Sequence, residues 1–371
     1  MRPSSRAARP APVPAAGAGV SYVMPVLNEE RYLEDAVRSI LRQRVDEPVE
    51  IVLALGPSTD GTADVAQRLA EEDPRVLLVD NPDTDIPAGL NRAIRASRFP
   101  TIVRVDAHSN LPDDYTATAL EALARTAAAN VGGHMRAEGL RPFQRAVARV
   151  YMSRFGLGGP SYHMGGAEGP SESAYLGVFR RSVLDEVGLY DESVRRGEDW
   201  ELNHRIRSAG YTVWFDPRLE VTYRPRETWE QMARQFYATG TWRGELARRL
   251  GHRIGVRYFV PPAFVGVVAV AGVTGAVAAS GRLTGSARAV GALSWSGVAA
   301  YVVGLVAIVT GPEGGDDARD RVRTAVVFPT AHLAWGAGFW NGLVRGAGRT
   351  TDTSRVTAGR PRTSSEQTPP R

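Results

Sequence analysis

Two short motifs have residue types and spacing that suit the handling of phosphate and protons. In the first, Asp106 and His108 directly follow the apolar run at residues 101–105. Side chains at positions i and i+2 can reach one ion where the backbone bends; a carboxylate suits Mg²⁺ or Mn²⁺, and an imidazole favours Mn²⁺. This motif indicates a divalent cation held against a diphosphate. The alternative interpretation is a strand-end turn with a solvated acid and histidine.

The second motif is the sequence GEDWE at residues 197–201, which places acids at the start of a helix. The helix dipole stabilises carboxylates at this end, so a simple charge preference is one interpretation. The other makes Asp199 a general base that removes the proton from an attacking hydroxyl, with Glu198 beside it in the substrate site. Spacing alone leaves both interpretations open.

A third segment, residues 235–243 (QFYATGTWR), mixes aromatic residues with arginine just before a long apolar run. In the functional interpretation, Trp242 stacks on a sugar and Arg243 meets a phosphate. In the alternative, these residues form an interfacial belt in which Trp and Arg lie at the level of the lipid headgroups.

Composition excludes several other chemistries. The 371 residues include no cysteine, which rules out a disulfide framework, a thiolate zinc site and a cysteine nucleophile. Neither a nucleophile elbow nor a GxxxxGK[ST] phosphate loop occurs. The 45 Lys and Arg against 40 Asp and Glu make the chain mildly basic, with arginines gathered before the first long apolar run. This placement favours a membrane surface over nucleic acid.

The scaffold that must position these motifs is predicted to be an α/β domain with a mostly parallel, Rossmann-like sheet. Apolar runs of strand length alternate with helical patterns at βαβ spacing. Parallel sheets bind ligands at the carboxyl ends of their strands, and Asn28, Asp60 and Asp106 each follow a strand. We therefore expect these three side chains to converge on one crevice. The glycine-rich stretch 132–170 is expected to be a loop. The predicted strands are 20–26, 49–55, 75–80, 101–105, 175–180 and 211–215.

The chain is expected to divide into four parts. Residues 1–19 form a disordered leader, 20–250 the catalytic domain, 257–345 a membrane domain and 346–371 a disordered basic tail. Within the membrane domain, segments 258–280 and 289–310 carry no charge and can cross a hydrocarbon core of about 30 Å. Segment 324–344 contains Pro329, His332 and Asn341, and it spans the membrane, re-enters it or lies at the interface.

Together these motifs resemble family 2 glycosyltransferases of the GT-A fold, in particular membrane-associated enzymes of the succinoglycan type of exopolysaccharide biosynthesis. The resemblance covers roughly residues 20–344. The matching segments are 23–29 (VMPVLNE), 58–62 (STDGT), 89–94 (GLNRAI), 105–108 (VDAH), 175–181 (YLGVFRR), 197–203 (GEDWELN), 223–226 (YRPR) and 332–336 (HLAWG).

The resemblance implies an inverting transfer of a sugar from a nucleotide-sugar donor to a lipid-linked or glycan acceptor. By the same resemblance, Asp199 is the catalytic base, and Asp106 and His108 hold Mn²⁺ or Mg²⁺. The enzyme would lie in the cell membrane as a multi-pass protein with its catalytic domain in the cytoplasm. Many relatives have an acid that contacts the nucleotide base where this chain has Leu55. The residues implied in substrate binding are Pro25, Asn28, Glu29, Asp60, Asn91, Arg92, Asp106, Glu198, Trp242 and Arg243.

Two other functions remain open at this point. A processive polysaccharide synthase would make a long, polydisperse product, but the short membrane domain offers no evident channel for one. A catalytically silent membrane scaffold would keep the fold only to bind partners. The presence of both Asp106 and Asp199 argues against the scaffold.

Overall fold

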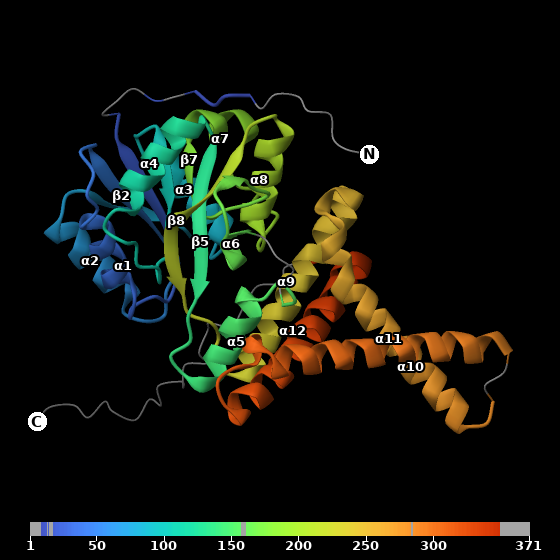
Figure 1. Ribbon diagram of the computed structural model, residues 1–371. Coiled ribbons are helices and arrows are strands. Elements are labelled where there is room, and N and C mark those ends of the chain that lie inside the picture. The colour runs from blue at the N-terminus through green and yellow to red at the C-terminus, as the bar shows by residue number, and fades with distance from the viewer. Residues whose placement is uncertain (1–8, 13, 15–17, 157–160, 283–284, 349–371) are drawn as a thin grey trace, which may run out of the picture.

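The computed structural model describes residues 9–12, 14, 18–156, 161–282 and 285–348. Most of the expected leader and basic tail therefore lies outside the described residues. The N-terminal part of the chain is built around one sheet (Figure 1). Its strands are β1 (Val20–Val26), β2 (Val49–Leu55), β3 (Val76–Asp80), β4 (Thr101–Arg104), β5 (Asn130–Ala137), β6 (Gly169–Pro170), β7 (Tyr175–Arg180) and β8 (Val213–Tyr223).

The sheet has eight strands in the order β3-β2-β1-β4-β7-β5-β8-β6. Strands β1 to β4 form a continuous parallel group. Strand β7 is antiparallel to its neighbours β4 and β5, whereas β5 and β8 are parallel to each other. The prediction of a mostly parallel sheet is confirmed. The carboxyl ends of β1, β2 and β3 are in register, since Val26 pairs with Leu55 and Leu55 with Asp80.

Helices cover both faces of the sheet. Alternate residues of β1 point to opposite sides, so Tyr22 packs with α1, α2 and α4 while Val23 packs with α3, α7 and α8. This burial on two faces explains why the parallel strands are continuous apolar runs. The helices of this domain are α1 (Leu33–Leu41), α2 (Thr62–Glu72), α3 (Ile86–Ala96), α4 (Tyr115–Thr126), α5 (Pro142–Met152), α6 (Ser161–Met164), α7 (Arg181–Val187) and α8 (Glu198–Ser208).

The glycine-rich stretch 132–170 is not the loop that was expected. It contains most of β5 and all of α5, α6 and β6. A Cβ on Gly133 would lie 1.7 Å from the backbone oxygen of Leu219, at the point where the register between β5 and β8 shifts. Glycine is needed here because the two strand backbones approach closely. The prediction was wrong because these glycines serve strand packing.

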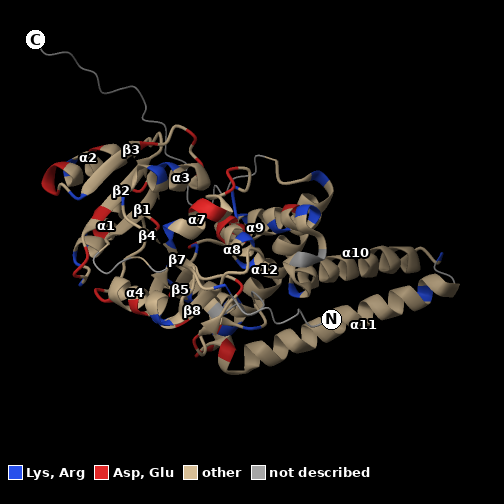
Figure 2. Cartoon of the chain, turned by 90° about the horizontal axis from the view of Figure 1, so that it is seen from above, with Lys and Arg blue, Asp and Glu red and all other residues tan. Residues whose placement is uncertain are grey.

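Four helices follow the α/β domain: α9 (Trp229–Leu250), α10 (Val260–Ala279), α11 (Gly285–Thr310) and α12 (Ala318–Arg345). Helices α10 and α11 form a hairpin that extends away from the rest of the molecule (Figure 1). They are almost free of charged residues along their length, as their tan colour in Figure 2 shows. Among the described residues, two segments are long and apolar enough to cross a membrane: Val256–Ala279 and Gly285–Thr310.

Helix α12, which contains the third predicted segment, does not meet the same criteria. It begins with the charged sequence ARDRVR and packs along α9, where Phe236, Trp335 and Phe339 share one hydrophobic core. Of the placements left open for residues 324–344, this packing favours a helix at the membrane interface. Helices α9 and α12 therefore lie between the α/β domain and the membrane-type hairpin formed by α10 and α11.

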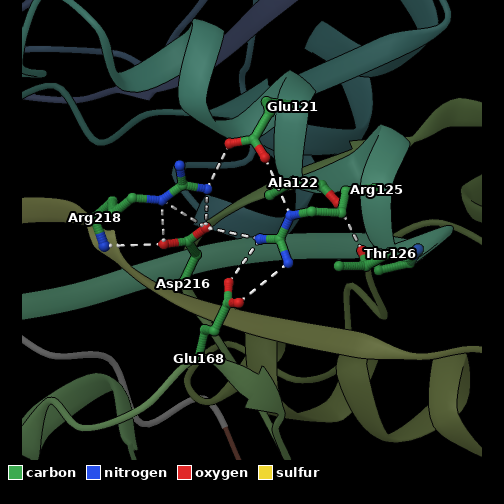
Figure 3. Close-up of polar contacts among 8 residues, drawn as sticks. Glu121, Ala122, Arg125, Thr126, Glu168, Asp216 and Arg218 are labelled. Atoms are coloured by element: carbon green, nitrogen blue, oxygen red, sulfur yellow. Dashed lines mark hydrogen bonds and ion pairs between the residues drawn. The ribbon is translucent and has the colours of Figure 1, made fainter.

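An ion-pair network at the outer edge of the sheet joins α4 to β8 (Figure 3). Arg218 on β8 binds the nearly buried carboxylate of Asp216 through two nitrogens and reaches Glu121 on α4 at 2.6 Å. Arg125 on α4 binds Glu168, just before β6, at 2.6 Å. A single exposed ion pair contributes little to the stability of a fold, but a network of them fixes the geometry of the elements that it joins. Here it fixes the edge from which the chain enters β6 and β7.

The contact between α9 and α12 depends on glycine, which gives a first prediction. A Cβ on Gly240 would lie 2.0 Å from the backbone oxygen of Trp335. We expect Gly240→Ala to lower the thermal unfolding temperature by several degrees, because overpacking costs about 1–3 kcal/mol and outweighs the helix propensity of alanine. Gly266→Ala on α10 is the matched control, since nothing lies within 4 Å of its Cβ position. Equal unfolding temperatures of the two variants in detergent would contradict this account of the helix contact.

Candidate active site

A cleft of about 480 Å³ opens at the carboxyl ends of β1 and β4. This is the edge at which parallel sheets bind ligands. The start of α8 and residues of α6, α9 and α12 are among the elements that form its other walls. The predicted site residues that line it are Pro25, Glu29, Asp106, His108, Glu198, Asp199 and Arg243. Those that do not line it are Asn28, Asp60, Asn91, Arg92 and Trp242.

Arg104, on β4, connects the two acidic motifs. Its side chain is only 5% exposed, and its Nη2 atom lies 3.2 Å from Oδ1 of Asp106. On the other side, Nη1 lies 3.0 Å from Oε1 of Glu198 and also donates to the carboxylate of Asp199. Burial opposes its charge, but the carboxylates of Asp106 and Glu198 raise the pKa of Arg104 above its ordinary value. The guanidinium therefore stays charged and holds the strand-end acid next to the start of α8.

Asp106 and His108 carry donor atoms for a divalent cation, but too few to hold one alone. Nδ1 of His108 lies 2.9 Å from Oε1 of Glu29, and all three side chains line the cleft. Within the part of the chain that the structure describes, no cluster of three or more such side chains could hold a metal ion. Mg²⁺ is commonly bound through one or two carboxylates, with substrate phosphates and water completing its shell. The residues present therefore fit a cation shared with a bound diphosphate.

Asn28 and Asp60 join the loop after β1 to the start of α2, beside the cleft. Asn28 has a left-handed backbone (φ +56°), and its Oδ1 accepts a hydrogen bond from the amide of Thr59 at 2.8 Å. Asp60 accepts from the hydroxyl and amide of Thr62 and from the amide of Glu30. Burial works against its charge, but these hydrogen bonds hold the pKa of Asp60 below its ordinary value. Both side chains brace the loops beside this end of the cleft.

Asn91 and Arg92 lie on α3 and have different surroundings. Asn91 is buried; its amide donates to the backbone oxygen of Tyr190 at 2.9 Å and accepts from the amide of the same residue. The ring of Tyr190 in turn lies 5.9 Å from the guanidinium carbon of Arg104. Asn91 thus holds the segment that covers Arg104. Arg92 pairs with Asp83 at 2.8 Å on the surface.

Trp242 and Arg243, which are neighbours on α9, point in different directions. Trp242 is 2% exposed and lies in the hydrophobic core between α9 and α12. Stacking on a sugar needs a ring that faces the cleft, so we correct its predicted role to one in packing. Arg243 lines the cleft, and its guanidinium lies 4.7 Å from the ring centre of Trp200 and 4.2 Å from that of Tyr258. It is an arginine held between two aromatic rings.

Sequence reasoning missed Arg104, although a signal for it was present. It is the single charged residue in the run 101–105 and lies two positions before Asp106. Residues two apart in a strand point to the same face, so their contact could have been expected. Arg196 was also missed; its Nε donates to Thr239 on α9 at 2.7 Å and ties the segment before α8 to that helix. No sequence signal marks this contact, because the partner depends on how α9 packs.

Comparison with known proteins identifies the family to which this site belongs. The model of glycosyl transferase family 2 matches residues 21–188. The succinoglycan biosynthesis protein ExoA of Rhizobium meliloti (strain 1021) is 33% identical over 327 residues, which cover 87% of this chain and 94% of that protein. The chain belongs to glycosyl transferase family 2. This glycosyltransferase is thus similar to ExoA along nearly its whole described length, including the C-terminal helices.

Two further relatives of this glycosyltransferase are more distant. A dolichyl N-acetyl-alpha-D-glucosaminyl phosphate 3-beta-D-2,3-diacetamido-2,3-dideoxy-beta-D-glucuronosyltransferase of Methanococcus voltae is 23% identical over 62% of the chain and 74% of that protein. The mannosyltransferase PcManGT of Pyrobaculum calidifontis, solved with GDP-Man and Mn²⁺, superposes with a TM-score of 0.58 at 21% identity. The superposition covers 88% of this chain and 87% of PcManGT, and it confirms the GT-A fold.

Proposed function

We propose that this glycosyltransferase is an inverting, metal-dependent enzyme of cell-envelope or exopolysaccharide biosynthesis. It moves a sugar from a nucleotide-sugar donor to a lipid-linked or membrane-proximal acceptor. The observation that carries the proposal is the convergence of Asp106 and Asp199 on Arg104, in a cleft that also includes residues of the membrane-adjacent helices. The similarity to a succinoglycan biosynthesis protein supports the pathway, and the activity named for the Methanococcus relative supports a lipid-linked acceptor.

The cleft residues have different roles in a single-displacement reaction. The carboxylate of Asp199 takes the proton of the acceptor hydroxyl as the hydroxyl oxygen forms a bond to the anomeric carbon. The bond between that carbon and the diphosphate breaks at the same time, and the nucleoside diphosphate leaves with the electron pair. Arg104 donates a hydrogen bond to the carboxylate of Asp199, whose side chain lines the cleft. Because attack and departure occur on opposite sides of the carbon, the configuration inverts.

Asp106 and His108 would hold the divalent cation together with the donor diphosphate, and the Mn²⁺ in the PcManGT structure supports this assignment. When bound, the cation would supply positive charge to stabilise the departing diphosphate. The hydrogen bond between His108 and Glu29 fixes the orientation of the imidazole. Pro25 lines the same end of the cleft, while Asn28 and Asp60 brace its loops around the nucleotide.

We assign the catalytic domain, residues 20–250, to the cytoplasm, where nucleotide sugars are found. Two membrane crossings, by α10 and α11, return the chain to the side from which it entered. Helix α12 and the arginine-rich tail 346–371 then lie on the cytoplasmic side as well. This arrangement agrees with the positive-inside rule, which three crossings would have violated.

Removal of the metal and of its carboxylate ligand tests the proposal. We expect the detergent-purified protein to release nucleoside diphosphate from one member of a panel of UDP-, GDP- and dTDP-sugars with Mn²⁺ or Mg²⁺. Excess chelator should abolish release, and Asp106→Ala should lower it at least about 10²-fold, because the leaving charge loses its stabilisation.

Asp113→Asn is the control, since Asp113 is a half-buried acid that pairs with Arg44 outside the cleft. Full turnover in chelator, or an Asp106→Ala variant as active as Asp113→Asn, would refute metal dependence. The product must contain one added sugar, because a long polydisperse product would instead indicate a processive synthase.

A further inference from the structure

A second cavity, of about 540 Å³, lies between the active-site cleft and the membrane-type helices. Its walls come from the start of α10, the second half of α11 and the middle of α12. Phe264, Leu305, Ile308 and Phe328 make this part of the cavity apolar. Its volume falls within the range of about 300–1,000 Å³ that is typical of ligand sites. The mechanism described above makes no use of this cavity.

The cavity lies next to the active-site cleft. Both are lined by side chains of α6, α9 and α12, and these form the boundary between the two spaces. A ligand bound in the apolar cavity would therefore have its polar end at this boundary. The shared lining residues are Tyr162, His163, Phe236, Thr239, Arg243 and Trp335.

Two arginines at this boundary have buried nitrogen atoms without a hydrogen-bond partner among the described residues. Arg243 is 9% exposed, and its Nη1 atom makes no hydrogen bond. The Nε atom of Arg257 is also buried without a partner, while its Nη2 atom pairs with Glu172. Buried donors are costly to leave unsatisfied, so such atoms call for a ligand that accepts hydrogen bonds.

The charge at the boundary favours an anionic ligand. Glu172 pairs with Arg257, and no acidic side chain lines the apolar cavity in the described part of the chain. Arg154 adds a third cation to that lining. Burial lowers the pKa of His163 to about 3, so its ring is neutral at physiological pH and neither adds nor cancels charge. An arginine held between Trp200 and Tyr258 is preorganised, which suits it to a phosphate oxygen.

We propose that the apolar cavity holds the hydrocarbon chain of the acceptor lipid and that Arg243 and Arg257 bind its phosphate. This inference rests on the proposed function, because the sugar attached to that phosphate would then extend into the cleft toward Asp199. The hydrocarbon chain, the phosphate and the sugar of such a lipid follow one another in the same order as their surroundings in the protein. These surroundings are the apolar walls between α10, α11 and α12, then the cationic boundary, and then the base. The lipid would enter from the membrane between α10 and α11.

The test uses the full chain in phosphatidylcholine nanodiscs, with farnesyl phosphate, farnesol and inorganic phosphate as separate probes. Binding is followed by the fluorescence of the tryptophans, since Trp335 lines both cavities. Gly304→Leu fills the cavity from α11, where nothing lies within 4 Å of the Cβ position. We expect it to weaken the binding of farnesyl phosphate about tenfold or more, because displacing two methylene groups of the chain already has this effect. Binding of the nucleotide-sugar donor should be unchanged.

Gly266→Leu is the matched control on α10, because this glycine also faces open space but does not line the cavity. A second variant, Arg243→Met, should weaken the binding of farnesyl phosphate and leave the binding of farnesol unchanged. Unchanged farnesyl phosphate binding in Gly304→Leu would overturn the proposal, as would inorganic phosphate that binds as well as farnesyl phosphate. Failure of the proposed function would look different, since donor binding or turnover would then be absent while lipid binding persists.

Discussion

Asp199→Asn is expected to lower kcat for sugar transfer by about 10²–10⁴-fold, which is the usual contribution of a general base. Asparagine has the same shape as aspartate and can still accept a hydrogen bond from Arg104 through its amide oxygen. It cannot take the proton of the acceptor hydroxyl. We therefore expect the KM for the nucleotide sugar to remain within a few-fold of its original value, with the loss confined to kcat. Initial rates of nucleoside diphosphate release, measured with saturating acceptor, separate the two parameters.

Glu201→Gln provides the control for this prediction. Glu201 lies in the same first turn of α8 and pairs with Arg205 at 2.8 Å, but it does not line the cleft. The substitution removes the same charge from the same helix end. If both variants lose equal activity, the effect belongs to the charge at the start of α8 and not to a base. If Asp199→Asn retains its activity, another group takes the proton.

The fold could be predicted largely from the sequence, because strands that are buried on both faces of a sheet leave a strong pattern of apolar residues. Parallel strands covered by helices on both sides become continuous apolar runs, and 49–55 (VEIVLAL) has this form. The topological rule for parallel sheets then placed the residues after these strands at one edge. It correctly brought Asp106 to the cleft, and it brought Asn28 and Asp60 to loops beside it.

Contacts between segments that are far apart in the chain could not be predicted. Whether Trp242 or Arg243 faces the cleft depends on how α9 packs against α12, roughly a hundred residues further along. Asn91 follows an apolar helical pattern, but its partner is the backbone of Tyr190 in a loop without regular structure. Gly133 resembles a loop residue until its distance to β8 is known. In each case the information lies in a partner that the local pattern does not contain.

Arg104→Met is expected to have the second large effect, because it removes the cation that the two acidic motifs share. Breaking a buried ion pair by removing one partner costs about 3–5 kcal/mol, since the other charge remains buried and uncompensated. The carboxylate of Glu198 is only 6% exposed and is the group most affected. We expect a fall of kcat by about 10²–10³-fold together with a lower unfolding temperature. Steady-state kinetics and thermal unfolding in detergent measure the two effects.

The pH dependence of stability separates this explanation from simple loss of packing. Without Arg104, the three acids of the cluster lose the cation that they share, so the folded variant takes up a proton that the unfolded chain does not bind near neutral pH. Stability must then fall as pH rises, because the folded state binds more protons than the unfolded state. The difference in unfolding temperature from the unaltered protein should therefore be larger at pH 8 than at pH 5. Arg104→Lys keeps the charge but cannot reach both motifs at once, so it should restore most of the stability and only part of kcat. A difference in unfolding temperature that is independent of pH would mean that Arg104 contributes volume and not charge.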